Sequence, residues 1–181
     1  MKVIRIMLLC VCLLFTTVTF AQTKGWRGIV PLHSTRADVE KLLGAPVSDQ
    51  LTGQCQCLYK SETENIRILY ANGSPCSESQ QRDGRVGGWK VSRDTVLEVT
   101  VYFKAERTLS DLKIDESKYK KETDAHLPGW VSYTNREEGI RIEGGKRTIT
   151  SISYFPIKKD DYLRYPASAK HLCEAASSRP E

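Results

Sequence analysis

YKSETENIRI, residues 59–68, returns in the second half of the chain as YTNREEGIRI, residues 133–142. The two stretches have the same length and agree at five of ten positions. The matched pairs are Tyr59 with Tyr133, Glu64 with Glu138, Ile66 with Ile140, Arg67 with Arg141 and Ile68 with Ile142. A turn-forming residue, Asn65 or Gly139, precedes the first isoleucine of each stretch, as is typical of a β-hairpin. Each stretch therefore predicts a hairpin with buried isoleucines and solvated charges.

A second match supports an internal duplication. Tyr102-Phe103 and Tyr154-Phe155 each end a predicted strand, and they follow their hairpins in the same order. The hairpins are offset by 74 residues (133 minus 59), whereas these strand ends are offset by 52 (154 minus 102). The polar, glycine-rich loop 74–94 has nearly the length of the difference, 22 residues (74 minus 52). The sequence thus predicts two related units, with an insertion in the first.

The clearest helix signal lies in GIVPLHSTRADVEKLLGAP, residues 28–46. Thr35 followed by Asp38 is a capping-box pattern, and Gly44 provides a C-terminal cap. The apolar positions of the following turns fall at helical spacing: Val39, Leu42 and Leu43. Because such a short helix cannot stand alone, we expect it to lie on a sheet.

This stretch, together with the hairpin and the strand IRILYANG at 66–73, resembles the small secreted domains of the SmpA/OmlA lipoprotein class. Those domains place a "G-x-(S/T)-x-x-x-V-x-x-x-L-G-x-P" helix ahead of a three-stranded sheet. Two such units in tandem are similar in plan to the β-lactamase inhibitory protein family, whose paired repeats form a concave protein-binding face. The chain lacks the lipid-attachment cysteine of the first class. The resemblance implies a fold and no particular site residues.

We therefore expect an α+β fold, in which two related helix-plus-antiparallel-sheet units share one extended sheet with helices on one face. The predicted segments are a signal peptide at 1–21, a first unit at 22–104 with the inserted loop 74–94, a second unit at 105–157 and a C-terminal tail at 158–181. A second helix is predicted near Asp115–Thr123, because Asp115 can cap it and the following residues are mostly helix-compatible.

The N-terminus, MKVIRIMLLCVCLLFTTVTFAQ, has the pattern of a secretory signal peptide. Lys2 and Arg5 precede an apolar run, and small residues follow at 19–21. We expect a secreted or periplasmic product with no stable membrane anchor after cleavage. Removal of the two basic residues lowers the formal charge from +5 to +3 (5 minus 2). This mixed charge gives no indication of nucleic-acid binding.

Four cysteines remain after processing: Cys55, Cys57, Cys76 and Cys173. An even number in an exported chain predicts two disulfides, for which three pairings are open. Cys55 and Cys57 are separated by one residue, so each is expected to pair elsewhere. The cysteines lack the spacing of a zinc site, and neither a metal nor a cofactor is expected.

Recognisable catalytic motifs are absent from the sequence: there is no G-x-S-x-G, H-E-x-x-H, P-loop or G-x-G-x-x-G. The leading hypothesis is therefore a non-enzymatic protein-binding or inhibitory module. Polar residues that alternate with the core on the last strands would line its binding face. The predicted binding residues are Trp89, Glu98, Thr100, Tyr102, Thr150 and Tyr154. Trp89 is also interpretable as a core residue at a strand end.

Two other functions are compatible with the sequence. A small secreted hydrolase would use the carboxylates Glu64, Glu138 and Asp94 in a cleft between the units. A binder of acidic polysaccharide would use a set of lysines: Lys118, Lys120, Lys121, Lys158 and Lys159. Asn72, in Asn-Gly-Ser, is a formal glycosylation acceptor and also part of a typical hairpin-turn pair.

Overall fold

A computed structural model describes residues 25–49, 55–73, 88–124 and 126–165. Its first half contains α2 (Arg36–Leu43), β1 (Ser48–Asp49), β2 (Gln56–Lys60), β3 (Glu64–Tyr70) and β4 (Val96–Arg107). Its second half contains η2 (Glu116–Lys118), β5 (Lys120–Thr123), β6 (Val131–Asn135), β7 (Ile140–Gly144), β8 (Ile149–Tyr154) and η3 (Lys158–Leu163). The predicted signal peptide lies outside these described residues.

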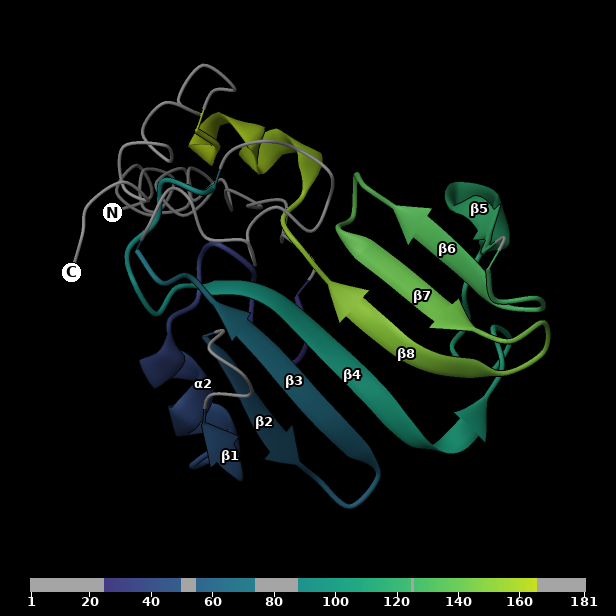
Figure 1. Cartoon of the computed structure of the whole chain (residues 1–181), viewed down its shortest axis with the longest axis horizontal. Helices are drawn as coiled ribbons and strands as arrows, with labels where there is room; N and C mark the ends of the chain where they lie inside the picture. The colour runs from purple at the N-terminus through teal and green to yellow at the C-terminus, as the bar shows by residue number, and fades with distance from the viewer. Residues whose placement is uncertain (1–24, 50–54, 74–87, 125, 166–181) are drawn as a thin grey trace, which may run out of the picture.

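The strands form one antiparallel sheet of eight strands in the order β1-β2-β3-β4-β8-β7-β6-β5. In Figure 1 they lie side by side from α2 and β1 at the lower left to β5 at the upper right. The α+β prediction with a helix in each unit is wrong, because α2 is the one α-helix within the described ranges. The fold is instead β-rich, with a single sheet as its main element.

The strand order is symmetric about the pairing of β4 with β8. On one side lies the hairpin β2-β3, and on the other lies the hairpin β6-β7. These hairpins contain the two similar stretches of sequence. At the centre, Thr100 pairs with Ser153 and Val101 with Ile152. The outer strand of each hairpin pairs in turn with a short edge strand, β1 or β5.

The hydrophobic core covers one face of this sheet. In the first half, Ile66, Ile68 and Val101 pack beneath Trp26, Ile29 and Val39. In the second half the buried set comprises Val131, Tyr133, Ile140, Ile142, Ile149 and Ile152. Phe103 and Tyr154 pack against both clusters and join them. The two halves therefore share a continuous core on a common face.

The same capping motif begins the helical segment that packs on the core in each half. Thr35 donates its backbone N–H to Asp38 Oδ2 (2.8 Å), and Asp38 donates its own to Thr35 Oγ1 (3.3 Å). Thr108 and Asp111 make the corresponding hydrogen bonds at 2.8 and 3.2 Å. The first box opens the eight-residue helix α2, whereas the second opens a single turn that ends at Lys113 with φ 53°. Leu109 and Leu112 of this turn pack on the second half of the core.

The helix predicted near Asp115–Thr123 is wrong. Asp115 does cap, since its carboxylate accepts from the backbone N–H of Ser117, but it caps only the three-residue 3-10 helix η2. The residues that follow form β5, whose side chains are all exposed. A helix here would have no apolar face to bury, whereas an edge strand tolerates charges because one of its sides faces solvent.

The face predicted for Leu97 on β4 is wrong, because the strand contains a bulge. The alternation of Leu97, Val99, Val101 and Phe103 predicts one shared face. The register shifts so that Tyr70 pairs with Val96 rather than Leu97. Val96 then joins the main core, and Leu97 packs with Leu69 and Trp89 in a separate cluster. A bulge moves one side chain to the other face in this way.

The capping carboxylates predict a specific loss of stability in acid. Hydrogen bonds from Thr35 hold the pKa of Asp38 below its usual range, and those from Thr108 do the same for Asp111. A depressed folded-state pKa stabilises the fold above the ordinary pKa, and this stabilisation is lost as the pH falls through the folded value. Between about pH 6 and about pH 2, the melting temperature should fall more steeply for the wild type than for an Asp38→Asn/Asp111→Asn variant. A Thr35→Ala/Thr108→Ala variant should show an equally weak dependence of melting temperature on pH. Equal dependence in the wild type and the variants would contradict the prediction.

Candidate functional site

The face of the sheet opposite the core carries a row of polar side chains across its four central strands. The row runs from Arg67 on β3 through Thr100 on β4 and Ser153 on β8 to Arg141 on β7. Residues directly opposite each other on paired strands project to the same face. The two arginines that the hairpins share therefore flank two hydroxyl groups at the centre of the sheet.

The hydroxyls form a hydrogen-bonded network with a defined direction. Arg67 Nη2 donates to Thr100 Oγ1 (3.3 Å), and Thr100 Oγ1 donates to Glu98 Oε1 (2.8 Å). The Oγ atoms of Thr100 and Ser153 are 3.1 Å apart. Because the proton of Thr100 is directed to Glu98, Ser153 must donate to Thr100. Arg67 also forms an ion pair with Glu98 at 3.6 Å, which neutralises its charge.

Each arginine lies over an aromatic ring of its own half. The guanidinium carbon of Arg67 is 5.5 Å from the ring centre of Tyr102. That of Arg141 is 5.6 Å from the ring centre of Phe155. Cation–π contacts at this separation fix the position of the guanidinium over the ring. Both arginines are thus held along the sheet by a ring contact, and in Arg67 the Nη2 group also binds Thr100 and Glu98.

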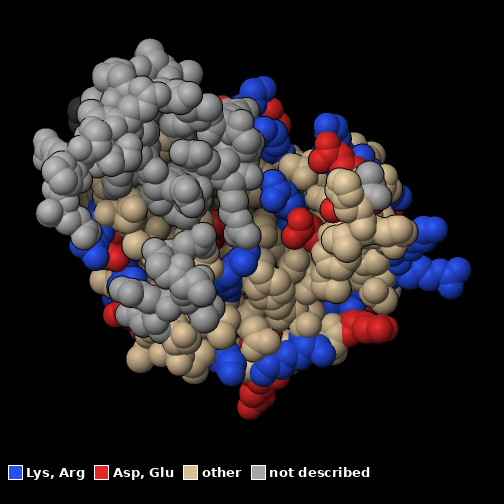
Figure 2. All heavy atoms as spheres, viewed as in Figure 1, with Lys and Arg blue, Asp and Glu red and all other residues tan. Residues whose placement is uncertain are grey.

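The centre of the polar face is recessed. Thr100, Ser151 and Ser153 expose only 2%, 3% and 5% of their surface, although none belongs to an apolar cluster. The purple N-terminal segment passes behind the sheet in Figure 1, so Figure 2 looks onto the polar face from the same side. Figure 2 shows a hollow over the middle of the sheet, with basic and acidic side chains along it. Short side chains at the centre and long ones beside them account for this shape.

The structure brings three of the six predicted binding residues together on this face: Glu98, Thr100 and Tyr102. Tyr154 pairs with Val99 and packs against both core clusters, so it lies on the opposite face. Burial raises the pKa of its hydroxyl. Thr150 lies at the bulge of β8, is exposed, and donates to the carbonyl oxygen of Glu143 at 3.0 Å.

Trp89, the sixth predicted residue, is a core residue in the structure. It exposes 6% of its surface and packs with Leu69 and Leu97. Arg164 lies over its ring, 3.9 Å from the centre, and the two residues form a β-bridge. Residues 88–90 and 163–165 are thereby joined into a short ribbon over one end of the polar face. Trp89 is not available there as a platform for a ligand.

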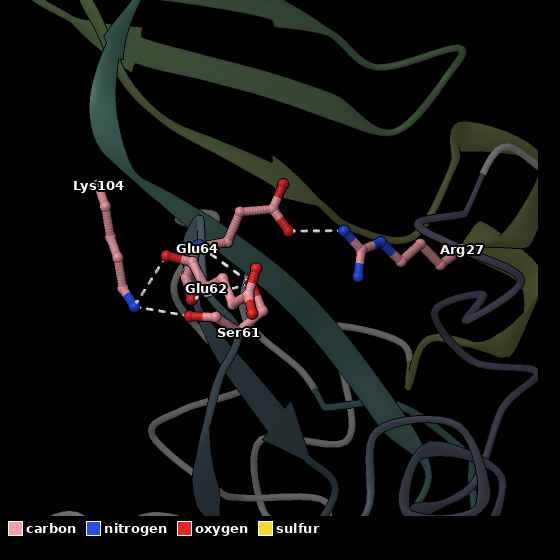
Figure 3. A network of polar contacts seen from close by, with 5 residues as sticks. All are labelled: Arg27, Ser61, Glu62, Glu64 and Lys104. Carbon is pink, nitrogen blue, oxygen red and sulfur yellow. Dashed lines mark hydrogen bonds and ion pairs between the residues drawn. The ribbon is translucent and has the colours of Figure 1, made fainter.

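The carboxylates proposed for a hydrolase lie at different ends of the sheet. Glu64 pairs with Phe103 in the register and points to Arg27, whose Nη2 is 2.9 Å away (Figure 3). The Nζ of Lys104 binds the carbonyl oxygens of Ser61 and Glu62 in the same loop.

Asp94 precedes β4 at the other end of the sheet and is bound by Arg36 at 3.2 Å. Glu138 lies at that same end, just before β7. The three carboxylates therefore form no common site.

The lysines of the polysaccharide hypothesis are also separated. Lys118 and Lys120 lie at the β5 edge, where Lys120 forms an ion pair with Glu122. Lys121, on the same strand, lies over the ring of Tyr133. Lys158 follows β8 in η3 and pairs with Glu137 at 3.1 Å, beside Lys159. These two groups belong to different parts of the fold and form no continuous basic patch.

The remaining predicted features are only partly within the described residues. Cys55 and Cys57 are not joined to each other, while Cys76 and Cys173 lie outside the described ranges, so the disulfides stay a prediction. Within the same ranges, no helix is long and apolar enough to cross a membrane. No cluster of three or more His, Cys, Asp or Glu suited to a metal occurs in that part of the chain. Asn72 is exposed, two positions after the last residue of β3.

Sequence reasoning missed the two arginines as site residues. Their repetition is visible in the sequence, where it predicts only solvated charges on two hairpins. The central row depends on the pairing of β4 with β8, which the sequence does not specify locally. The repeated Arg between two buried isoleucines was the available signal.

No known protein family, curated protein or solved structure matches this chain.

Proposed function

We propose that the chain is an exported, non-enzymatic module that binds another protein through the polar face of its sheet. The observation that carries this proposal is the recessed row Arg67–Thr100–Ser153–Arg141, framed by Glu98 and Tyr102. A continuous polar surface with fixed arginines and an aromatic side chain is typical of a protein interface, where such residues are enriched. Exported localisation follows from the signal-peptide pattern and remains part of the proposal.

The arrangement of the face favours binding over catalysis. Hydrogen bonds, an ion pair and ring contacts fix its charged groups, and none of its carboxylates is paired with another. General acid–base catalysis by carboxylates requires two such groups near one reacting bond. The carboxylates nearest to such a role, Glu64 and Asp94, are each bound by an arginine at opposite ends of the sheet.

Site-specific photo-crosslinking in the native organism tests the proposal. A photoreactive phenylalanine derivative replaces Tyr102 on the polar face or, as the matched control, Leu42, which is 52% exposed on α2 across the sheet. We expect one discrete protein adduct from position 102 and none from position 42. Circular dichroism establishes that both variants fold. Equal adducts from the two positions, or none from position 102, would contradict binding through the polar face.

A further inference from the structure

The two arginines of the polar row differ in one respect. Arg67 has a carboxylate partner, Glu98, on the adjacent strand. Arg141 makes no hydrogen bond or ion pair with any residue in the described ranges, and its contact there is the ring of Phe155. The charge of Arg141 contributes to lowering the pKa of Glu122 on β5, after the larger effect of Lys120. That carboxylate already forms an ion pair with Lys120 at 2.6 Å. The second half thus contains an arginine that is held by a ring contact and forms no ion pair with a carboxylate of the described residues, including Glu143 two positions along the same strand.

The symmetry of the sheet identifies the missing group. In the first half, Arg67 pairs with Thr100 in the register; the aromatic residue lies two positions after Thr100 and Glu98 lies two positions before it. In the second half, Arg141 pairs with Ser153, and Phe155 lies two positions after it. The residue two positions before Ser153 is Ser151. Serine therefore stands where the first half has its glutamate.

We propose that an acidic side chain of a protein partner supplies this missing carboxylate to Arg141, beside Phe155. The inference deepens the proposed function and rests on it, because it names the chemical group that the polar face recognises. The contact with Phe155 engages no N–H group of Arg141 in a hydrogen bond, so these groups can bind a carboxylate in a bidentate manner. Ser153 does not compete, since its proton is directed to Thr100.

The surrounding charges favour a carboxylate over a phosphate group. Glu98 and Glu143 lie on the same face, and they pair in the register with positions adjacent to the row. A doubly charged phosphate would be repelled by both, whereas a single carboxylate balances the one unneutralised guanidinium.

Arginine side-chain NMR tests this assignment on the full-length protein. A blocked tri-glutamate peptide is titrated at low ionic strength, with a blocked tri-glutamine peptide as the uncharged control. We expect a saturable shift of the Arg141 Nε–Hε signal with the glutamate peptide and none with the glutamine peptide. The signal of Arg67 should stay in place, because Glu98 already occupies its site.

Two arginine variants separate a specific site from general attraction. Arg141→Gln should weaken peptide binding by at least about tenfold, whereas Arg107→Gln, on an exposed part of β4, should leave it unchanged. Ser151→Glu should abolish the shift in otherwise wild-type protein by supplying an internal carboxylate. If the buried glutamate prevents folding, Arg141→Gln still decides the question. Equal loss in both arginine variants, or no shift of Arg141, overturns the assignment.

A sulfated oligosaccharide serves as a competing probe. If it shifts Arg141 and the glutamate peptide does not, the site binds another class of anion and the proposal is wrong. The proposed function can survive this failure: crosslinking from position 102 that persists in the Arg141→Gln variant would keep protein binding and reject the acidic contact. Loss of the adduct in Arg141→Gln but not in Arg107→Gln would support both.

Discussion

Replacing Gly139 with alanine is expected to lower the free energy of unfolding by about 3 kcal/mol. Gly139 has a φ of 65°, in the left-handed region that disfavours other residues. A Cβ at this position would collide with the carbonyl oxygen of Phe155 and lie 2.9 Å from the side chain of Ile157. The clash is with backbone that also hydrogen-bonds Gly139, since Phe155 N donates to its carbonyl oxygen at 2.8 Å. The backbone at Gly139 and that at Phe155 therefore cannot move apart freely.

Gly129→Ala is the matched control for this experiment. Gly129 has a φ of 90°, but no atom lies within 4 Å of the Cβ that alanine would add. This variant should show only the backbone cost, about 1 kcal/mol. Urea denaturation followed by circular dichroism measures both. If the two variants lose the same stability, the close approach between Gly139 and Phe155 is not a constraint on the fold.

Ile142→Ala should also lower the free energy of unfolding by about 3 kcal/mol. The side chain is fully buried in the core of the second half, so its loss leaves a cavity beneath β7. Thr134→Ala, on the polar face of the neighbouring β6, should change stability by less than about 0.5 kcal/mol. The same denaturation experiment compares the two.

The effect of Ile142→Ala should extend to the first half. Phe103 and Tyr154 join the two core clusters, and β4 pairs with β8 across the centre of the sheet. Amide hydrogen exchange should therefore show equal loss of protection in β3 and β7. Unchanged protection in β3 would mean that the halves unfold independently.

Much of the sheet could be predicted from short-range patterns. The repeated Tyr, Ile and turn residues indicated both hairpins, and the capping box of Thr35 and Asp38 indicated α2. These signals act within a few residues, so the sequence carries them directly. The second capping box, at Thr108, is a weaker helix signal in the sequence, because only one turn follows it. The α+β class was wrong because a second helix was expected where the chain has no apolar face to bury.

The site could be predicted only in part, because it depends on contacts between distant strands. Alternation along β4 placed Glu98, Thr100 and Tyr102 on the polar face. A single bulge moved the side chain of Leu97 to the other face of the sheet, and the pairing of β4 with β8 placed Tyr154 with the core. The role of Arg141 depends on which residue faces it across β8. No local pattern encodes that register.

The central pairing of β4 with β8 also constrains the order in which the fold can be completed. β4 is synthesised before β8, and residues 108–148 separate the two strands in the chain. Until β8 is available, a first half that folded early would present the long edge of β4 to other chains. Such edges promote aggregation during folding. A chain that remains unfolded until β4 and β8 are both available avoids this hazard. In such a chain, the pairing of β4 with β8 is also the step that protects the folding protein from self-association.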